Sequence, residues 1–145
     1  MPATPVAIAS DHAGVALKGA LIEELQVLGY EVLDLGTEGP GSVDYPDFGQ
    51  AMAETIAAGR AGRGVIVCGT GIGISIAANR HPKVRAAVCH DVTSARLARE
   101  HNDANVLALG ARLIGVEVAK ECLKTFLETD FAGGERHERR VAKLG

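Results

Sequence analysis

The sequence predicts an α/β domain built on a five-stranded parallel sheet with helices on both faces. Short apolar runs alternate with longer amphipathic segments five times along the chain, which is the pattern of repeated strand–helix units. The run at 65–68 is apolar throughout, as expected for a central parallel strand covered on both sides. The length of 145 residues is close to the size of one domain, so we expect a single domain over 1–145.

Each predicted strand is a short apolar run rich in Val, Ile, Leu and Ala. Gly or Asp follows each of these runs within two residues. We place the strands at residues 6–9, 31–35, 65–68, 84–89 and 106–109.

Helices are predicted where apolar residues recur every three or four positions. Leu17, Leu21 and Leu25 mark the first helix, and Gly29 ends it. The Asp47–Gln50 spacing resembles a capping box and predicts a helix over 48–60. Further helices are expected from the glycine-rich turn to about residue 79, over 93–100, over 116–127, and in the tail after residue 133.

Composition excludes several classes of partner. The net charge of −3 and the 3% of aromatic residues argue against nucleic acid or an anionic membrane as a partner. Residues 1–5 carry no charged signal segment, and no stretch approaches the roughly 20 apolar residues of a membrane span. The three cysteines are odd in number and widely spaced. We therefore expect free thiols in the reducing cytoplasm.

Polar residues that a core does not need appear at three places next to predicted strands. If the sheet is parallel, all three lie on or near its carboxyl edge, where α/β proteins bind ligands. These residues are Asp11 and His12 after the first strand, Cys68 to Thr70 after the third, and His101 and Asn102 at the end of the helix that follows the fourth.

Cys68 closes a strand just before a glycine-rich turn that opens a helix. The free N–H groups and partial positive charge of a helix start favour the thiolate, so Cys68 is a candidate base or nucleophile. The Gly69–Gly73 turn lets its backbone cradle an oxyanion or a phosphate. It lacks the lysine of a P-loop and the third glycine of a dinucleotide fingerprint, but Asp91 lies about 20 residues further on, which leaves nucleotide binding as an alternative. The other two cysteines are interpreted as core residues.

The tail carries a candidate anion site. Arg136 and Arg140 are four residues apart and would share a helix face, where two guanidinium groups suit a phosphate. A solvated charged tail explains the same spacing equally well, and Arg112 could join the pair. No pair of histidines or cysteines has the spacing of metal ligands, so no metal is expected.

Several motifs together resemble one family over nearly the whole chain. They closely resemble ribose-5-phosphate isomerase B and the wider group that includes galactose-6-phosphate isomerase. The motifs are Ser10-Asp-His-Ala-Gly14, Asp44-Tyr-Pro46, the twelve-residue block Cys68-Gly-Thr-Gly-Ile-Gly-Ile-Ser-Ile-Ala-Ala-Asn79, His101-Asn-Asp-Ala-Asn-Val-Leu107, and Arg136-His137 with Arg140.

The resemblance implies a Rossmann-like three-layer sandwich, no cofactor, and a homodimer or homotetramer with sites between subunits. The C-terminal basic helix from about residue 134 would then pack on a neighbouring subunit. Cys68 would be the base, Thr70 and the amides of Gly69, Gly71, Ile72 and Gly73 would steady an enediolate, and His101 with Asp11 would open the sugar ring. The substrate-binding residues would be His12, Tyr45, Asn102, Arg112, Arg136 and Arg140.

The resemblance implies an aldose–ketose isomerase of carbohydrate metabolism, which converts ribose 5-phosphate and ribulose 5-phosphate in the pentose phosphate pathway. Enediolate chemistry needs a base within reach and fixed donors near the developing oxyanion, and the Cys68 turn offers both. Allose 6-phosphate or galactose 6-phosphate are alternative substrates. Two different classes of function also fit these residues: a cysteine-nucleophile hydrolase, and a non-catalytic module that binds a nucleotide or a sugar phosphate.

Overall fold

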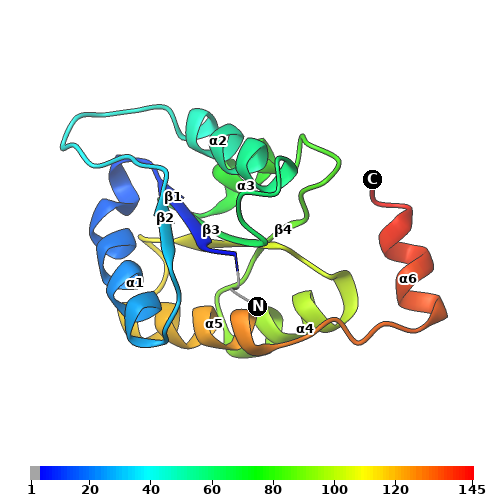
Figure 1. Cartoon of the computed structure of the whole chain (residues 1–145). Coiled ribbons are helices and arrows are strands. Elements are labelled where there is room, and N and C mark those ends of the chain that lie inside the picture. Colours follow the sequence, from blue (N-terminus) through cyan, green and yellow to red (C-terminus); the bar gives the residue numbers. More distant parts are fainter. Residues whose placement is uncertain (1–3) are drawn as a thin grey trace.

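The computed structural model describes residues 4–145 and contains a parallel sheet of five strands in the order β2-β1-β3-β5-β4 (Figure 1). The strands are β1 (Val6–Ser10), β2 (Val32–Asp34), β3 (Arg63–Cys68), β4 (Ala86–Val88) and β5 (Val106–Gly110). All five predicted strands are confirmed. The two edge strands, β2 and β4, are shorter than predicted, because each pairs with only one neighbour.

Helices cover both faces of the sheet, which confirms the predicted Rossmann-like sandwich. One face carries α1 (Val15–Val27), α4 (Val92–Asn102) and α5 (Val116–Glu128); the other carries α2 (Tyr45–Ala57) and α3 (Ile72–Ala78). The last helix, α6 (Glu135–Ala142), stands apart from the sheet beyond α4 (Figure 1). None of the helices in the described part of the chain is long and apolar enough to cross a membrane.

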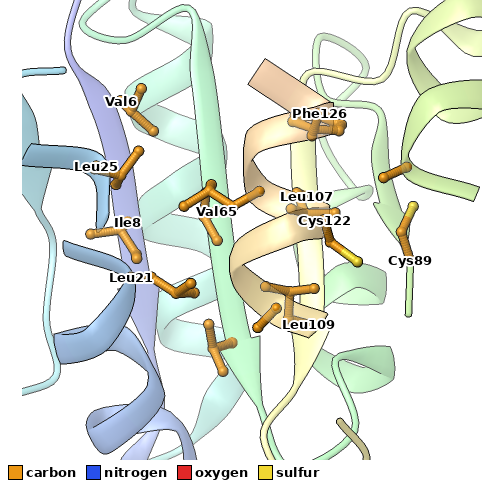
Figure 2. Packing of buried hydrophobic residues seen from close by; sticks show 14 of the residues in the cluster. Val6, Ile8, Leu21, Leu25, Val65, Cys89, Leu107, Leu109, Cys122 and Phe126 are labelled. Carbon is orange, nitrogen blue, oxygen red and sulfur yellow. The ribbon is translucent and has the colours of Figure 1, made fainter. Parts of the chain in front are cut away.

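The alternation of side chains along each strand divides the core into two clusters. Val6 and Ile8 of β1 pack toward α1, whereas Ala7 and Ala9 pack toward α2. Figure 2 shows the first cluster, in which leucines of α1 lie over β1 and Phe126 of α5 lies beside β5. Cys68 belongs to the second cluster, so its side chain points to the α2–α3 face of the sheet.

Helix α2 begins at Tyr45, earlier than the capping-box spacing predicts, so that prediction is wrong. Asp44 is the N-cap in an extended conformation, without a side-chain capping bond, and Pro46 lies in the first turn. Proline suits this position because its fixed φ is helical and its missing N–H would have no partner in the helix. The helix therefore starts one turn earlier, which brings the Tyr45 ring beside α3.

The loop after β2 is anchored to the end of β1. Lys18 of α1 is 3% exposed, and its Nζ donates to both carboxylate oxygens of Asp34, at 2.7 and 2.9 Å. The Asp34 carboxylate also accepts the Gly36 N–H at 2.9 Å. The Ser10 N–H donates to the Gly36 carbonyl at 2.7 Å, and the Thr37 N–H returns a bond to the Ser10 carbonyl at 2.8 Å. These bonds fix the backbone just before Asp11.

Candidate active site

A cleft of about 510 Å³ opens at the carboxyl edge of the sheet, where β1 and β3 lie side by side. The chain leaves β1 toward one edge of the sheet and leaves β3 toward the other, so this is the topological switch point where α/β sheets bind ligands. The cleft is lined by Asp11, His12, Ala13, Tyr45, Cys68, Gly69, Thr70, Ile72, Gly73, Ile76 and Arg112.

Cys68 lies at the base of this cleft, at the last position of β3, and is 4% exposed. Its Sγ accepts a hydrogen bond from the Gly71 N–H at 3.1 Å. The sulfur therefore lines the cleft with a fixed hydrogen-bond donor beside it.

The turn after Cys68 uses its own amides internally. The Gly71 N–H is directed at Cys68, and the Ile72 N–H donates to the Thr70 Oγ1 at 3.2 Å. Because Thr70 Oγ1 accepts this bond, its O–H proton remains able to donate to a ligand. The resemblance assigns the Gly71 and Ile72 amides to an enediolate, but here both donate hydrogen bonds within the turn.

Two glycines let the turn after β3 pack directly on the turn after β5. Gly71 has a φ of +77°, and a Cβ there would lie 2.9 Å from the carbonyl carbon of Leu109. A Cβ on Gly110 would lie 2.7 Å from the carbonyl carbon and oxygen of Thr70. Backbone atoms cannot yield at such distances, so only glycine fits at either position. The turn after β3 and the turn after β5 therefore pack directly against each other, backbone to backbone.

Asp11 and His12 enter the cleft from the end of β1. Asp11 is 6% exposed, and its carboxylate accepts the Ala13 N–H at 3.0 Å, which caps the short 3-10 turn His12–Gly14. His12 is exposed, and its Nδ1 accepts the Val43 N–H at 3.1 Å. That bond ties the 36–44 loop to the cleft and leaves the Nε2 atom for a ligand.

Arg112 is the basic side chain that lines the cleft. It follows β5, its N–H donates to the Gly69 carbonyl at 3.0 Å, and its side chain lies over Gly69, where a Cβ would be 3.5 Å from Nη1. Among residues 4–145, Arg112 takes part in none of the ion pairs. An exposed guanidinium beside His12 and a helix start makes this end of the cleft attractive to a small anion.

Tyr45 forms a wall of the cleft and packs against the first turn of α3. A Cβ on Gly73 would lie 2.5 Å from Cε1 of the ring, so the absence of a side chain at position 73 makes room for Tyr45. Ile76 continues the same wall one turn after Ile72. Sequence reasoning missed Ile76 and Ala13; the helical spacing of Ile72 and Ile76 was the available signal for the first.

His101 and Asn102 do not lie at the carboxyl edge, so that prediction is wrong. Helix α4 starts after the carboxyl end of β4 and returns to the start of β5, which places its last residues at the amino edge. Asn102 lines a separate cavity there, together with Val84 and Ala104. A helix that connects two parallel strands must run back across the sheet, so its last turn faces the opposite edge.

The α4–α6 cluster, which we define as His101, Asn102, Arg136, His137 and Arg140, gathers the remaining predicted residues. The rings of His101 and His137 stack with centroids 4.7 Å apart and planes 10° apart. Desolvation, and then the positive charges of His101, Arg136 and Arg140, lower the pKa of His137. Arg136 and Arg140 both lie on α6, as predicted, and no residue of that helix is buried.

Within one chain, Arg112 does not lie beside these two arginines. Arg112 lies in the cleft at the carboxyl edge, whereas α6 packs against α4 and stands clear of the sheet (Figure 1). The sequence-predicted site is thus divided into the cleft and the α4–α6 cluster.

The other two cysteines are buried. Burial raises the pKa of Cys89 above its ordinary value and raises the pKa of Cys122 to about 11. Both are therefore neutral core thiols at physiological pH, in agreement with their predicted role. Within residues 4–145, no three His, Cys, Asp or Glu side chains gather closely enough to hold a metal ion.

In chemical terms, the cleft combines a thiol, a hydroxyl, a carboxylate, an imidazole and a guanidinium group. Such a set suits proton transfer within a small anionic ligand.

The comparisons with known proteins agree with this chemistry. The family model described as Ribose/Galactose Isomerase matches residues 6–144. Ribose-5-phosphate isomerase B of Escherichia coli (strain K12) is 43% identical over 139 residues, which cover 96% of this chain and 93% of that protein. D-erythrulose-4-phosphate isomerase of Pectobacterium atrosepticum is 44% identical over 141 residues, covering 97% and 92%.

A solved structure gives the same result. Ribose-5-phosphate isomerase B of Clostridium thermocellum matches with a TM-score of 0.95 and 51% identity, over 98% of this chain and 95% of that one. Sequence and fold thus agree over almost the whole length with isomerases of small sugar phosphates. The chain therefore belongs to the ribose/galactose isomerase family and is a ribose-5-phosphate isomerase or a related sugar-phosphate isomerase.

Proposed function

We propose that this enzyme interconverts ribose 5-phosphate and ribulose 5-phosphate through an enediolate, with Cys68 as the base. The observation that carries the proposal is the position of the Cys68 sulfur: it lines a cleft that also holds Asp11, His12 and Arg112, and a backbone N–H is directed at it. The names of the relatives from Escherichia coli and Clostridium thermocellum support the five-carbon substrate.

In the proposed reaction, the Cys68 thiolate removes the proton from C2 of the open-chain aldose. The C2–H electron pair forms the C1–C2 double bond of the enediolate, and negative charge develops on O1. The Thr70 hydroxyl accepts from the Ile72 N–H, so its own proton would be free to stabilise that oxygen. The thiol then returns its proton to C1, and the O2 proton passes to O1, so that C2 becomes the carbonyl carbon of the ketose.

The phosphate of the substrate would be held away from the reacting carbons. His12 and Arg112 belong to the cleft itself. Their binding energy helps to position C1 and C2 beside the sulfur, because a ligand fixed at one end loses freedom at the other.

The rest of the site would come from a second copy of the chain. None of the residues of α6 is buried, and no residue of the α4–α6 cluster lines the cleft of its own subunit. In a homodimer, α6 from about residue 134 packs on the neighbour, so that His101 with Asp11 opens the ring, Asn102 contacts the sugar, and Arg136 and Arg140 bind the phosphate. Ile72 and Ile76, which are 52% and 59% exposed beside the cleft, provide apolar surface for that contact.

The test is isomerisation of ribose 5-phosphate in heavy water, followed by NMR. Wild-type enzyme should place deuterium at C1 of the ketose and C2 of the aldose. Cys68→Ala should abolish the exchange while ribose 5-phosphate still binds, and Cys89→Ala is the control that keeps it. An active Cys68→Ala enzyme would remove the thiolate from the mechanism.

The same experiment separates this reaction from the rival functions. Trapping of a covalent acyl adduct by mass spectrometry would indicate a cysteine-nucleophile hydrolase. Binding without deuterium exchange in the wild type would indicate a non-catalytic binding module. A higher kcat/KM for allose 6-phosphate or galactose 6-phosphate than for ribose 5-phosphate would reassign the substrate, as would one for erythrulose 4-phosphate, the sugar in the name of the Pectobacterium relative.

A further inference from the structure

We propose that His90 is a positioning residue, which holds the turn that carries Arg112 and supports the loop of Cys68. This inference rests on the proposed function, because it assigns Arg112 to phosphate binding. Its foundation is one hydrogen bond: the Gly110 N–H donates to Nε2 of His90 at 3.2 Å.

His90 completes a sheet ladder that the backbone leaves unfinished. Strand β4 pairs with β5 only as far as Val88 opposite Ala108, and the Cys89 N–H makes the last bond of that ladder, to the Ala108 carbonyl at 3.2 Å. The next N–H of β5 that faces this side belongs to Gly110, and β4 has already ended. The half-buried His90 ring lies beyond the end of β4 and supplies the acceptor.

Gly110 is the point from which the Arg112 turn leaves the sheet. The Ala111 N–H donates to the Cys68 carbonyl at 2.9 Å, and the Arg112 N–H donates to the Gly69 carbonyl at 3.0 Å. Gly110 also lies directly against the backbone of Thr70, where a Cβ would be 2.7 Å away. A shift of Gly110 therefore moves Arg112 and disturbs both bonds to the Cys68 loop.

The hydrogen bond to His90 holds Gly110, and with it the turn that carries Arg112, against the end of β4. Gly110 is buried, so its N–H cannot take water as a substitute partner without a movement of the turn. If the ring only filled space, an apolar side chain of similar size would replace it. If it acts as an acceptor, only a side chain with an acceptor at the same reach will serve.

The experiment compares His90→Leu, His90→Asn and His90→Gln. The glutamine amide oxygen reaches the place of Nε2, whereas leucine has no acceptor and asparagine is one carbon shorter. We expect His90→Leu and His90→Asn to raise KM for ribose 5-phosphate and Kd for inorganic phosphate about tenfold, with a smaller fall in kcat. His90→Gln should stay within about threefold of the wild type in all three.

His81→Leu is the matched control. His81 also accepts a backbone N–H, from Lys83 at 3.1 Å, but it does not line the cleft. Its replacement should leave KM, kcat and phosphate affinity unchanged. Hydrogen exchange of the Gly110 amide, followed by NMR, provides a second readout: the amide should be protected in the wild type and in His90→Gln, and exposed in His90→Leu and His90→Asn.

Two results would overturn the proposal. One is unchanged KM and phosphate affinity in folded His90→Asn or His90→Leu despite faster exchange at Gly110, which would make the bond purely structural. The other is a His90→Gln enzyme as impaired as His90→Leu. If instead the wild type fails to isomerise ribose 5-phosphate, while phosphate affinity and Gly110 exchange follow the expected order, then the proposed substrate is wrong and the positioning role of His90 stands.

Discussion

Replacement of Gly71 by alanine should damage both the fold and the activity of this enzyme. Gly71 has a φ of +77°, a conformation that costs a residue with a Cβ about 1–2 kcal/mol. The new Cβ would also lie 2.9 Å from the carbonyl carbon of Leu109 and 3.0 Å from its oxygen. Overpacking of this kind adds about 1–3 kcal/mol, so we expect a total loss of about 2–5 kcal/mol in the free energy of unfolding.

The chain contains a matched control for the backbone contribution. Gly59 has a φ of +75°, is exposed, and has open space where its Cβ would be. Gly59→Ala should therefore lose only the conformational part, about 1–2 kcal/mol. Urea denaturation of both variants measures the difference, which isolates the contact with Leu109.

Activity should separate the two variants further. The Gly71 N–H donates to Cys68, and displacement of the turn removes that donor. A hydrogen bond to a charged group contributes about 1.5–3 kcal/mol, so kcat/KM for ribose 5-phosphate should fall roughly 10- to 150-fold in Gly71→Ala. Gly59→Ala should retain the wild-type rate. Equal stabilities for the two variants, or a fully active Gly71→Ala enzyme, would refute this reasoning.

Three further predictions concern buried polar groups. The Ser10 hydroxyl has no hydrogen-bond partner among the described residues, so Ser10→Ala should leave the free energy of unfolding unchanged or raise it by up to about 1 kcal/mol. The control is Thr55→Ala, which loses a 2.8 Å hydrogen bond to a carbonyl and should lower the free energy of unfolding by about 1 kcal/mol. Urea denaturation measures both values. Asp34→Asn leaves the buried Lys18 ammonium without its partner carboxylate and should lower the free energy of unfolding by about 2–4 kcal/mol, because Asp34 is only partly buried. Adding Lys18→Met to the same chain removes the unpaired charge and should recover part of that loss. Because the pKa of Cys122 is raised to about 11 in the folded protein, from an ordinary value of 9.0, the unfolded state releases this proton first, and stability should fall as the pH rises from 9 toward 11. In thermal unfolding, the stability of Cys122→Ala should fall less between pH 9 and 11 than that of the wild type. An equal fall in both proteins would show that Cys122 is not the group responsible.

Local signals in the sequence predicted the strands and helices, apart from the start of α2, and most of the residues that line the cleft. The apolar run at 65–68 predicted the central strand. It also predicted that Cys68 ends that strand beside the glycine-rich turn, because the two are adjacent in the chain. The same holds for Asp11 and His12 after β1. The start of α2 was missed because two local signals competed, and the preference of Pro46 for a first turn prevailed over the Asp47–Gln50 spacing.

By itself, then, the sequence determined the strand–helix alternation, the parallel sheet and the residues at the ends of β1 and β3, since each depends on neighbours in the chain. Only the tertiary structure placed His101 and Asn102: the 11 residues of α4 span about 16 Å, which carries them from one edge of the sheet to the other. It alone brought the His90 ring to Gly110, because strand order, which no local pattern encodes, makes β4 and β5 neighbours. Periodicity reports which face of an element is buried, but not which other element covers that face.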